Sequence, residues 1–187
     1  MSRGRNPPQP GRGASEARLS EILRVDHAGE LGAVWIYRGQ RAVFAAGAGH
    51  EGVAAQLAEM EAHEAVHLEA FDKFLIDRHV RPTLLAPMWR IAGFALGAAT
   101  ALMGEKAAHA CTEAVETVIE RHYAGQIEEL EGREPALAGD LARFRDDELA
   151  HRDKAVEEGA RQAPGYPLLA GLIRAGCRAA IAAAEKF

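Results

Sequence analysis

The chain has 187 residues, of which 48% are hydrophobic and 26% are charged, proportions typical of one folded domain with a full core. A net charge of −5, without a basic stripe carrying interleaved aromatic residues, argues against nucleic acid as a partner. The two cysteines, Cys111 and Cys177, lack the Cys-x-x-Cys spacing of a zinc or iron-sulfur site, so we expect reduced core thiols.

The first 15 residues, MSRGRNPPQPGRGAS, predict a disordered tail. They lack the apolar run of a signal peptide, and their prolines and glycines prevent the amphipathic helix of a transit peptide. We therefore expect the folded domain to occupy residues 16–187, and a chain of bacterial type.

The remainder predicts an all-α domain, because Ala, Leu, Glu and Arg dominate and no segment alternates apolar with polar residues over strand length. Glycine and proline clusters divide it into six helices, expected at about residues 16–46, 51–78, 84–103, 105–131, 135–158 and 166–185. The stretch GAGHEG at 47–52 fits Gly-x-Gly-x-x-Gly, but a helix precedes it where a dinucleotide site needs a strand. We interpret it as a turn, so electrons for any redox reaction must come from outside the chain.

The second predicted helix places charged groups on its apolar face. Glu64 lies seven residues from both Leu57 and Phe71, and His67 follows Glu64 by one helical turn. A carboxylate that points into a core must be protonated, paired or bound to metal, since burying a bare charge costs several kcal/mol. This face therefore predicts a functional pair.

The same arrangement recurs in the fifth predicted helix, where Glu148 and His151 continue an apolar stripe. The first and fourth helices each add one inward carboxylate, Glu30 and Glu116, at nearly equal distances before the Glu-x-x-His helices. Each half of the domain is thus a Glu helix followed by a Glu-x-x-His helix. We interpret this as an internal duplication of a helical hairpin that builds a two-fold symmetric site.

Together these residues form the ligand set of a ferritin-like four-helix bundle with a dinuclear carboxylate centre. Four carboxylates and two imidazoles favour iron or manganese over zinc, and we predict two iron ions with open positions for dioxygen. Asp26 and Asp147 are candidates for orienting a metal-bound imidazole. The predicted metal ligands are Glu30, Glu64, His67, Glu116, Glu148 and His151.

Several long blocks resemble one family. LRVDHAGELGAVWIYRGQ (23–40), the stretch 81–123, FRDDELAHRD (144–153) and the closing LLAGLIRAGCRAAI are similar to the demethoxyubiquinone hydroxylases of ubiquinone biosynthesis. The family's six metal ligands match the six residues chosen above. The resemblance implies oxygen-dependent hydroxylation of the ring of a prenylated demethoxyquinone by a di-iron monooxygenase. It also implies O₂ as co-substrate, NADH as donor directly or through a reductase, and in some members a lipid-binding partner protein.

The resemblance further implies that His122 and Tyr123 assist electron transfer near the site. Helix geometry places Tyr123 two turns after Glu116, where it can equally be a core residue. The other histidines carry less signal. His63 is expected to point about 100° away from Glu64, His50 and His79 lie near helix ends, and His27 and His109 are weak inward candidates.

Two predicted helices are apolar beyond what a stripe requires. The third contains IAGFALGAATALM, which is too short to cross a bilayer, and we expect it to contact the membrane or line a quinone channel. In the sixth, Arg174 and Arg178 stand among Leu, Ile and Ala, as in a helix that lies in the membrane plane with cations at headgroup level. The alternative is that both helices pack as core. We expect a peripheral protein on the cytoplasmic side of the cell membrane.

Four alternative functions could use the same scaffold. A ferritin-like iron store would need a soluble shell surface in place of the apolar third helix. A peroxidase would call for a rubredoxin-like cysteine cluster, and a tRNA-modifying monooxygenase for a basic face. A structural bundle without metal predicts that the six inward residues bind nothing.

Overall fold

The computed structural model describes residues 12–186, and in this part of the chain the regular secondary structure consists of helices, without strands. The elements are α1 (Arg12–Phe44), α2 (Glu51–Asp77), α3 (Ala86–Leu102), α4 (Glu105–Leu130), α5 (Pro135–Glu157), the short 3₁₀ helix η1 (Ala160–Gln162) and α6 (Tyr166–Ala184). The predicted all-α class is therefore confirmed.

Five of the predicted helices begin and end within two residues of the observed bounds. The exception is α1, which begins at Arg12 and so includes residues assigned above to the tail. The last proline of that stretch is Pro10, so nothing in residues 12–15 prevents helical backbone. Residues 1–11, the rest of the predicted tail, lie outside the described residues.

The predicted turn at residues 47–52 is confirmed. Helix α1 ends at Phe44 and α2 begins at Glu51, so most of GAGHEG lies between two helices. Gly49 has φ 88°, a left-handed backbone angle that suits glycine. The element directly before the motif is the helix α1, whereas a dinucleotide-binding motif follows a strand.

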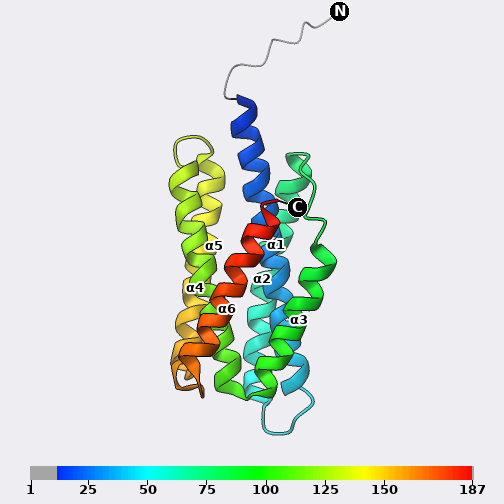
Figure 1. Ribbon diagram of the computed structural model, residues 1–187, viewed down its shortest axis with the longest axis vertical. Helices are drawn as coiled ribbons and strands as arrows, with labels where there is room; N and C mark the ends of the chain where they lie inside the picture. The colour runs from blue at the N-terminus through cyan, green and yellow to red at the C-terminus, as the bar shows by residue number, and fades with distance from the viewer. Residues whose placement is uncertain (1–11, 187) are drawn as a thin grey trace, which may run out of the picture.

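Four helices make the bundle, and two lie against it. Helix α1 pairs with α2, and α4 pairs with α5, so each half of the domain is a helical hairpin. Helix α3 packs mainly on α1, and α6 packs mainly on α4, so the two apolar helices cover one face of the bundle (Figure 1). This is the ferritin-like four-helix bundle with two additional apolar helices that the sequence predicts.

Apolar clusters close the bundle interior at both ends. One cluster includes Leu23, Phe71 and Leu141, and another includes Leu57 and Met60. Between them lie glutamates that are among the largest fully buried side chains of the described residues: Glu30, Glu64, Glu116 and Glu148. The fold therefore isolates one polar layer from water at the centre of the molecule.

Helices α1 and α3 approach closely through glycines. A Cβ on Gly97 would clash with the backbone carbonyl of Ile36, and one on Gly39 would clash with that of Phe94. A Cβ on Gly93 would stand 2.7 Å from the Gly32 carbonyl oxygen. Backbone therefore packs on backbone along this contact, and only glycine fits at these positions.

Candidate metal centre

The six predicted ligands meet in the polar layer. On each bundle helix, this is the level at which charged residues replace apolar ones on the inward face. Each is at most 5% exposed. Helix α1 supplies one carboxylate and α4 another, while α2 and α5 each supply a carboxylate and an imidazole one turn apart. The residues of this polar layer are Glu30, Glu64, His67, Glu116, Glu148 and His151.

Within the layer, the side chains form two groups that share members. In each group the potential ligand atoms lie within 4.8 Å of one another. Glu64 and Glu148 belong to both groups, whereas Glu30 and Glu116 belong to one each. The two Glu-x-x-His carboxylates thus lie at the centre of the layer, between two adjacent positions for a cation.

Both histidines turn the same ring nitrogen inward. His67 Nδ1 lies 3.1 Å from Glu148 Oε1 and 3.5 Å from Glu30 Oε2. His151 Nδ1 lies 3.0 Å from Glu64 Oε1 and 3.5 Å from Glu148 Oε2. The two imidazoles are therefore related in the same way to the shared carboxylates, as the duplicated hairpin predicts.

The inward atoms of the layer fit a metal because those that form ion pairs do so only with one another. Among the described residues none of them makes a hydrogen bond although each is buried, which is costly for polar atoms, and their ion pairs of 3.0 to 3.8 Å join one predicted ligand to another. Two divalent cations would give all of these atoms a partner. The set is rich in oxygen, as iron and manganese prefer. The atoms without a hydrogen-bond partner are Glu30 Oε2, both carboxylate oxygens of Glu64 and Glu148, Glu116 Oε2, and the Nδ1 atoms of His67 and His151.

The electrostatics of the layer point the same way. Burial, reinforced by the charge of Glu148, raises the pKa of Glu64 and of Glu116 well above the ordinary value. Burial acts in the same direction on Glu148, but contacts with His151 and His67 outweigh it and lower its pKa. Without metal, the layer therefore holds protons on some carboxylates, and a cation would displace them on binding.

Two tyrosines donate hydrogen bonds into the layer. Tyr123 Oη donates to Glu30 Oε1, and Tyr37 Oη donates to Glu116 Oε1 at 2.7 Å. Burial, together with the nearby carboxylates, raises the pKa of both phenols well above the usual value, so both stay protonated. The sequence analysis did not identify Tyr37 as part of the site. Its position seven residues after Glu30 on the same face is the signal that could have identified it.

The outer nitrogens of the two histidines have different partners. His67 Nε2 lies 3.1 Å from Asp147 Oδ2, in accord with the predicted orienting role of that aspartate. His151 Nε2 lies 3.2 Å from His63 Nδ1, with the two ring planes within 15° of each other. His63 does point away from Glu64 on its own helix. The expectation missed this contact because the partner comes from α5.

His122 lies beside the polar layer rather than in it. Its Nε2 is 2.9 Å from Gln126 Nε2 and 3.4 Å from Asp26 Oδ1, and Gln126 also donates to Asp26 at 2.8 Å. Asp26 therefore orients His122 and contacts neither imidazole of the layer, contrary to its predicted role. Tyr123 extends into the layer from the adjacent position, so the pair connects the buried carboxylates to a half-buried ring at the bundle edge.

The remaining histidines and the cysteines lie apart from the layer. His27 pairs with Asp72 at 3.0 Å, and His50 pairs with Glu105 at 2.7 Å. Cys111 is a buried free thiol whose pKa burial raises to about 12, as expected of an inert core cysteine.

An apolar cavity of about 530 Å³ lies between α3 and α6 on the outer side of α1 and α4. Two of its lining residues, Gly29 and Val115, directly precede Glu30 and Glu116 in the chain. The cavity therefore lies beside the two helices that carry the unshared carboxylates. Its volume is in the range of ordinary ligand sites, and its lining is almost wholly aliphatic or aromatic.

The outer surfaces of α3 and α6 are apolar. Helix α6 is long and apolar enough to span a bilayer by length and composition alone, a weak criterion that core helices also meet. Arg174 of this helix pairs with the buried Glu113 of α4 at 2.7 Å, a partner that the sequence pattern did not indicate. The exposed apolar residues are Leu84, Met88, Ile91, Phe94, Leu102 and Met103 around α3, and Leu168 and Leu172 on α6.

Comparison with known proteins agrees with this architecture. The chain is 50% identical over 177 residues to a 3-demethoxyubiquinol 3-hydroxylase of Rhodospirillum rubrum, covering 95% of this chain and 82% of that protein. It is 44% identical over 177 residues to the human NADPH-dependent 3-demethoxyubiquinone 3-hydroxylase, mitochondrial, covering 92% and 80% of the two chains. It is 40% identical over 190 residues to the 5-demethoxyubiquinone hydroxylase, mitochondrial, of Saccharomyces cerevisiae, covering 93% and 80%.

A profile of the family described as "Ubiquinone biosynthesis protein COQ7" matches residues 17–184, which is nearly the whole described chain. The match includes all six residues of the polar layer, both helical hairpins and the two additional helices. The chain belongs to the ubiquinone biosynthesis protein COQ7 family.

Proposed function

We propose that this protein is an O₂-dependent di-iron monooxygenase that hydroxylates the ring of a demethoxyubiquinone in ubiquinone biosynthesis. The observation that carries the proposal is the set of buried ligand atoms in the polar layer that have no hydrogen-bond partner. The relatives of this chain are named as hydroxylases of this substrate. One oxygen atom of O₂ enters the ring, and the other leaves as water.

We infer two metal positions from the two groups of ligand atoms. Glu30 and His67 would hold one metal and Glu116 and His151 the other, with Glu64 and Glu148 available to both. These side chains would leave coordination positions open, and two reduced irons bound there would supply the redox chemistry that activates dioxygen. Apolar layers on both sides of the polar layer keep bulk water away from it.

The tyrosines fix the two unshared carboxylates. Tyr37 and Tyr123 each occupy one oxygen of Glu116 and Glu30, which leaves the other oxygen of each free to bind. His122, held by Asp26 and Gln126 at the edge, continues the path from Tyr123 outward. We assign His122 and Tyr123 to proton-coupled electron delivery to the layer.

The apolar cavity provides a site for the substrate. An isoprenoid tail has no polar group to satisfy, so it suits a cavity whose lining is aliphatic and which opens between two surface helices. The quinone ring would then lie at the inner end, beside Glu30 and Glu116. An iron store would have no use for this cavity, which favours the hydroxylase over that alternative.

Membrane contact follows from the same face. Leu84, Ile91 and Leu102 around α3 are each more than 70% exposed, which suits insertion into the acyl region. We propose peripheral attachment to the cytoplasmic side of the cell membrane, from which a prenylated quinone enters directly. We expect the electrons to come from a reduced nicotinamide dinucleotide, directly or through a reductase, since the human relative is named NADPH-dependent. A lipid-binding partner protein remains a prediction.

The test begins with metal content. The protein is loaded with iron, reduced without oxygen, and mixed with O₂ and a demethoxyquinone, and the product is weighed by mass spectrometry with ¹⁸O₂. We expect two irons per chain and one ¹⁸O atom in the product. Iron without hydroxylation would move the assignment to iron storage or another oxidase, and absence of bound metal would reject it.

A narrower cavity should impair use of the long-tailed substrate. Gly176 lines the cavity, and no atom lies within 4 Å of the position a Cβ would take, so Gly176→Leu projects into the space without breaking the fold. We expect roughly a tenfold rise in KM for the prenylated quinone, with little change for a tail-less analogue. Gly171→Leu is the matched control, because Gly171 is an exposed residue of α6 outside the cavity. Equal kinetics in both variants would contradict the assignment of the cavity.

A further inference from the structure

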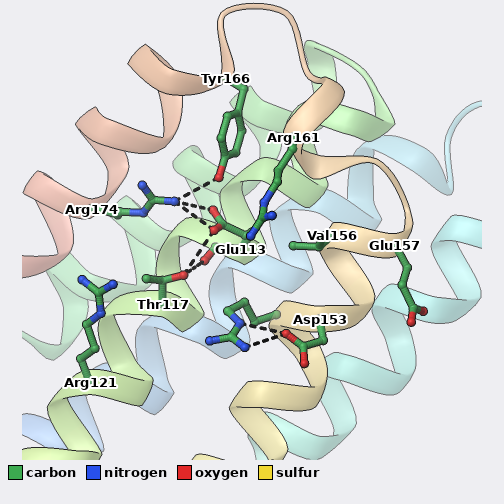
Figure 2. A pocket seen from close by; sticks show the side chains of 10 residues that line it. Glu113, Thr117, Arg121, Asp153, Val156, Glu157, Arg161, Tyr166 and Arg174 are labelled. Carbon is green, nitrogen blue, oxygen red and sulfur yellow. Dashed lines mark hydrogen bonds and ion pairs between the residues drawn. The ribbon is translucent and has the colours of Figure 1, made fainter.

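A second cavity lies on the other side of α6. It has a volume of about 650 Å³, it is lined mainly by polar groups, and it is bounded by α4, the end of α5, η1 and α6 (Figure 2). Helix α6 therefore separates two unlike spaces, one apolar and one charged. We call the second space the arginine pocket; its basic residues are Arg121, Arg152, Arg161 and Arg174.

Two of these arginines are already neutralised. Arg174 binds Glu113 through contacts of 2.7 and 3.0 Å and also lies 3.1 Å from the Tyr166 hydroxyl. Arg152 binds the adjacent Asp153 at 2.7 Å. Because Glu113 is buried and takes both contacts from one guanidinium, it forms a fixed wall of the pocket and leaves little negative charge facing the space (Figure 2).

The other two arginines have no counter-ion. Among the described residues, neither Arg121 nor Arg161 makes an ion pair or a side-chain hydrogen bond, although both line the cavity. They come from different elements, α4 and the η1 segment, and Figure 2 shows them on opposite sides of Thr117 and Glu113. The third acid of the lining, Glu157, lies 3.8 Å from Lys154. The pocket thus presents two guanidinium groups that an anion would satisfy, and this geometry suits phosphate oxygens.

The position of the pocket identifies the source of the anion. Tyr166 and Arg174 on α6 face the pocket, while Leu168 and Leu172 on the same two turns are 70% and 64% exposed. If these leucines enter the acyl region, the pocket mouth lies beside them at the level of lipid headgroups. A phosphate in that plane would approach Arg121 and Arg161 from the membrane side.

We propose that the arginine pocket binds the phosphate of an anionic phospholipid headgroup and so fixes the rotation of α6 on the membrane. This inference rests on the membrane contact in the proposed function. The lipid would bind on one side of α6, and the quinone would bind in the apolar cavity on the other side. The pocket is thus a lipid site distinct from the substrate site.

The test measures binding of the iron-loaded full chain to vesicles of phosphatidylglycerol and of phosphatidylcholine by sedimentation. Arg121→Gln combined with Arg161→Gln should weaken binding to phosphatidylglycerol vesicles roughly 30-fold, taking about tenfold per 1.4 kcal/mol and about 1 kcal/mol per basic residue. Binding to phosphatidylcholine vesicles should change less than twofold. Unchanged binding to phosphatidylglycerol, or an equal loss on both lipids, would overturn the proposal.

A charge-matched control separates the pocket from general attraction. Lys73→Gln combined with Arg143→Gln removes the same charge from exposed positions on α2 and α5, and within the described chain neither helix packs substantially on α3 or α6. This variant should bind phosphatidylglycerol as the wild type does, because distances beyond about 10 Å are screened at 0.1 M salt. A loss equal to that of the pocket variant would overturn the proposal.

Soluble phosphate is the competing source. Inorganic pyrophosphate at millimolar concentration should give no calorimetric binding signal that depends on Arg121 and Arg161, whereas micromolar binding that the double substitution removes would assign the pocket to a soluble ligand instead. Hydroxylation of a water-soluble demethoxyquinone by the wild-type protein is measured in parallel. If that reaction proceeds while the wild-type protein binds to neither kind of vesicle, the lipid site is rejected and the proposed hydroxylase function is retained.

Discussion

Glu116→Gln should remove most of the bound iron and lower hydroxylation by at least about 100-fold, with helix content unchanged. The side chain is 1% exposed, and its Oε2 atom has no partner among the described residues, so its charge has no role in packing. The amide keeps the volume and can still accept the Tyr37 hydrogen bond, but it lacks the negative charge that a metal requires. Outer-sphere changes alone cost 10- to 100-fold in metal affinity or activity; loss of a ligand should cost more.

Metal analysis and circular dichroism on the same samples check this prediction. Glu128→Gln is the control, since Glu128 is exposed on the same helix and should retain wild-type iron and activity. Unchanged iron in Glu116→Gln would favour the structural bundle without metal and would count against the whole ligand set. Loss of both iron and helix would instead assign Glu116 to folding.

Gly97→Ala should lower the free energy of unfolding by about 3 kcal/mol, at the upper end of the usual cost of overpacking. The added methyl would meet the backbone carbonyl of Ile36 and lie 3.1 Å from the Gln40 nitrogen, and backbone cannot move aside as a flexible side chain can. Helix α3 would therefore have to shift away from α1. For a chain of this size, the midpoint of thermal unfolding should fall by roughly 6–12 °C.

Thermal and denaturant unfolding of iron-loaded protein measure the effect. Gly125→Ala provides the comparison, because Gly125 lies within α4 and has no atom within 4 Å of its Cβ position. There the same substitution should be neutral or stabilise by up to about 1 kcal/mol, as alanine favours helix. Similar destabilisation in both variants would mean that the α1–α3 contact is not as close as the structure has it.

Periodicity was sufficient to predict the helices and the composition of the polar layer. Six strongly helical segments are separated by glycine and proline, so their ends were within two residues at all but one terminus. A carboxylate on an apolar heptad face has few structural explanations, and this identified Glu30 and Glu64 before any contact was known. Such arguments work within one helix.

For the same reason, contacts between helices could not be predicted from the sequence. The partners of Tyr37, His63 and Arg174 lie on α4, α5 and α4, and their positions depend on how the helices rotate against each other. A helical repeat gives the face of each residue but not what stands opposite it. The two cavities on either side of α6 were likewise unpredictable, because a void is a property of packing rather than of sequence pattern.

The glycine contact between α1 and α3 also bears on motion. One side of the apolar cavity is bounded by the contact between α1 and α3, where Gly93 of the lining and, further along the same contact, Gly39 and Gly97 bring backbone against backbone and hold α3 close to α1. The opposite side is α6, which is held by side-chain packing through Ala170 and Ile173 and begins after Gly165 with φ 67°. Of the two sides, α6 is therefore the one that can move as a unit and change the width of the entrance. We expect the rate at which bulky substrate and product exchange to be set by displacements of α6, which occur on the microsecond to millisecond timescale.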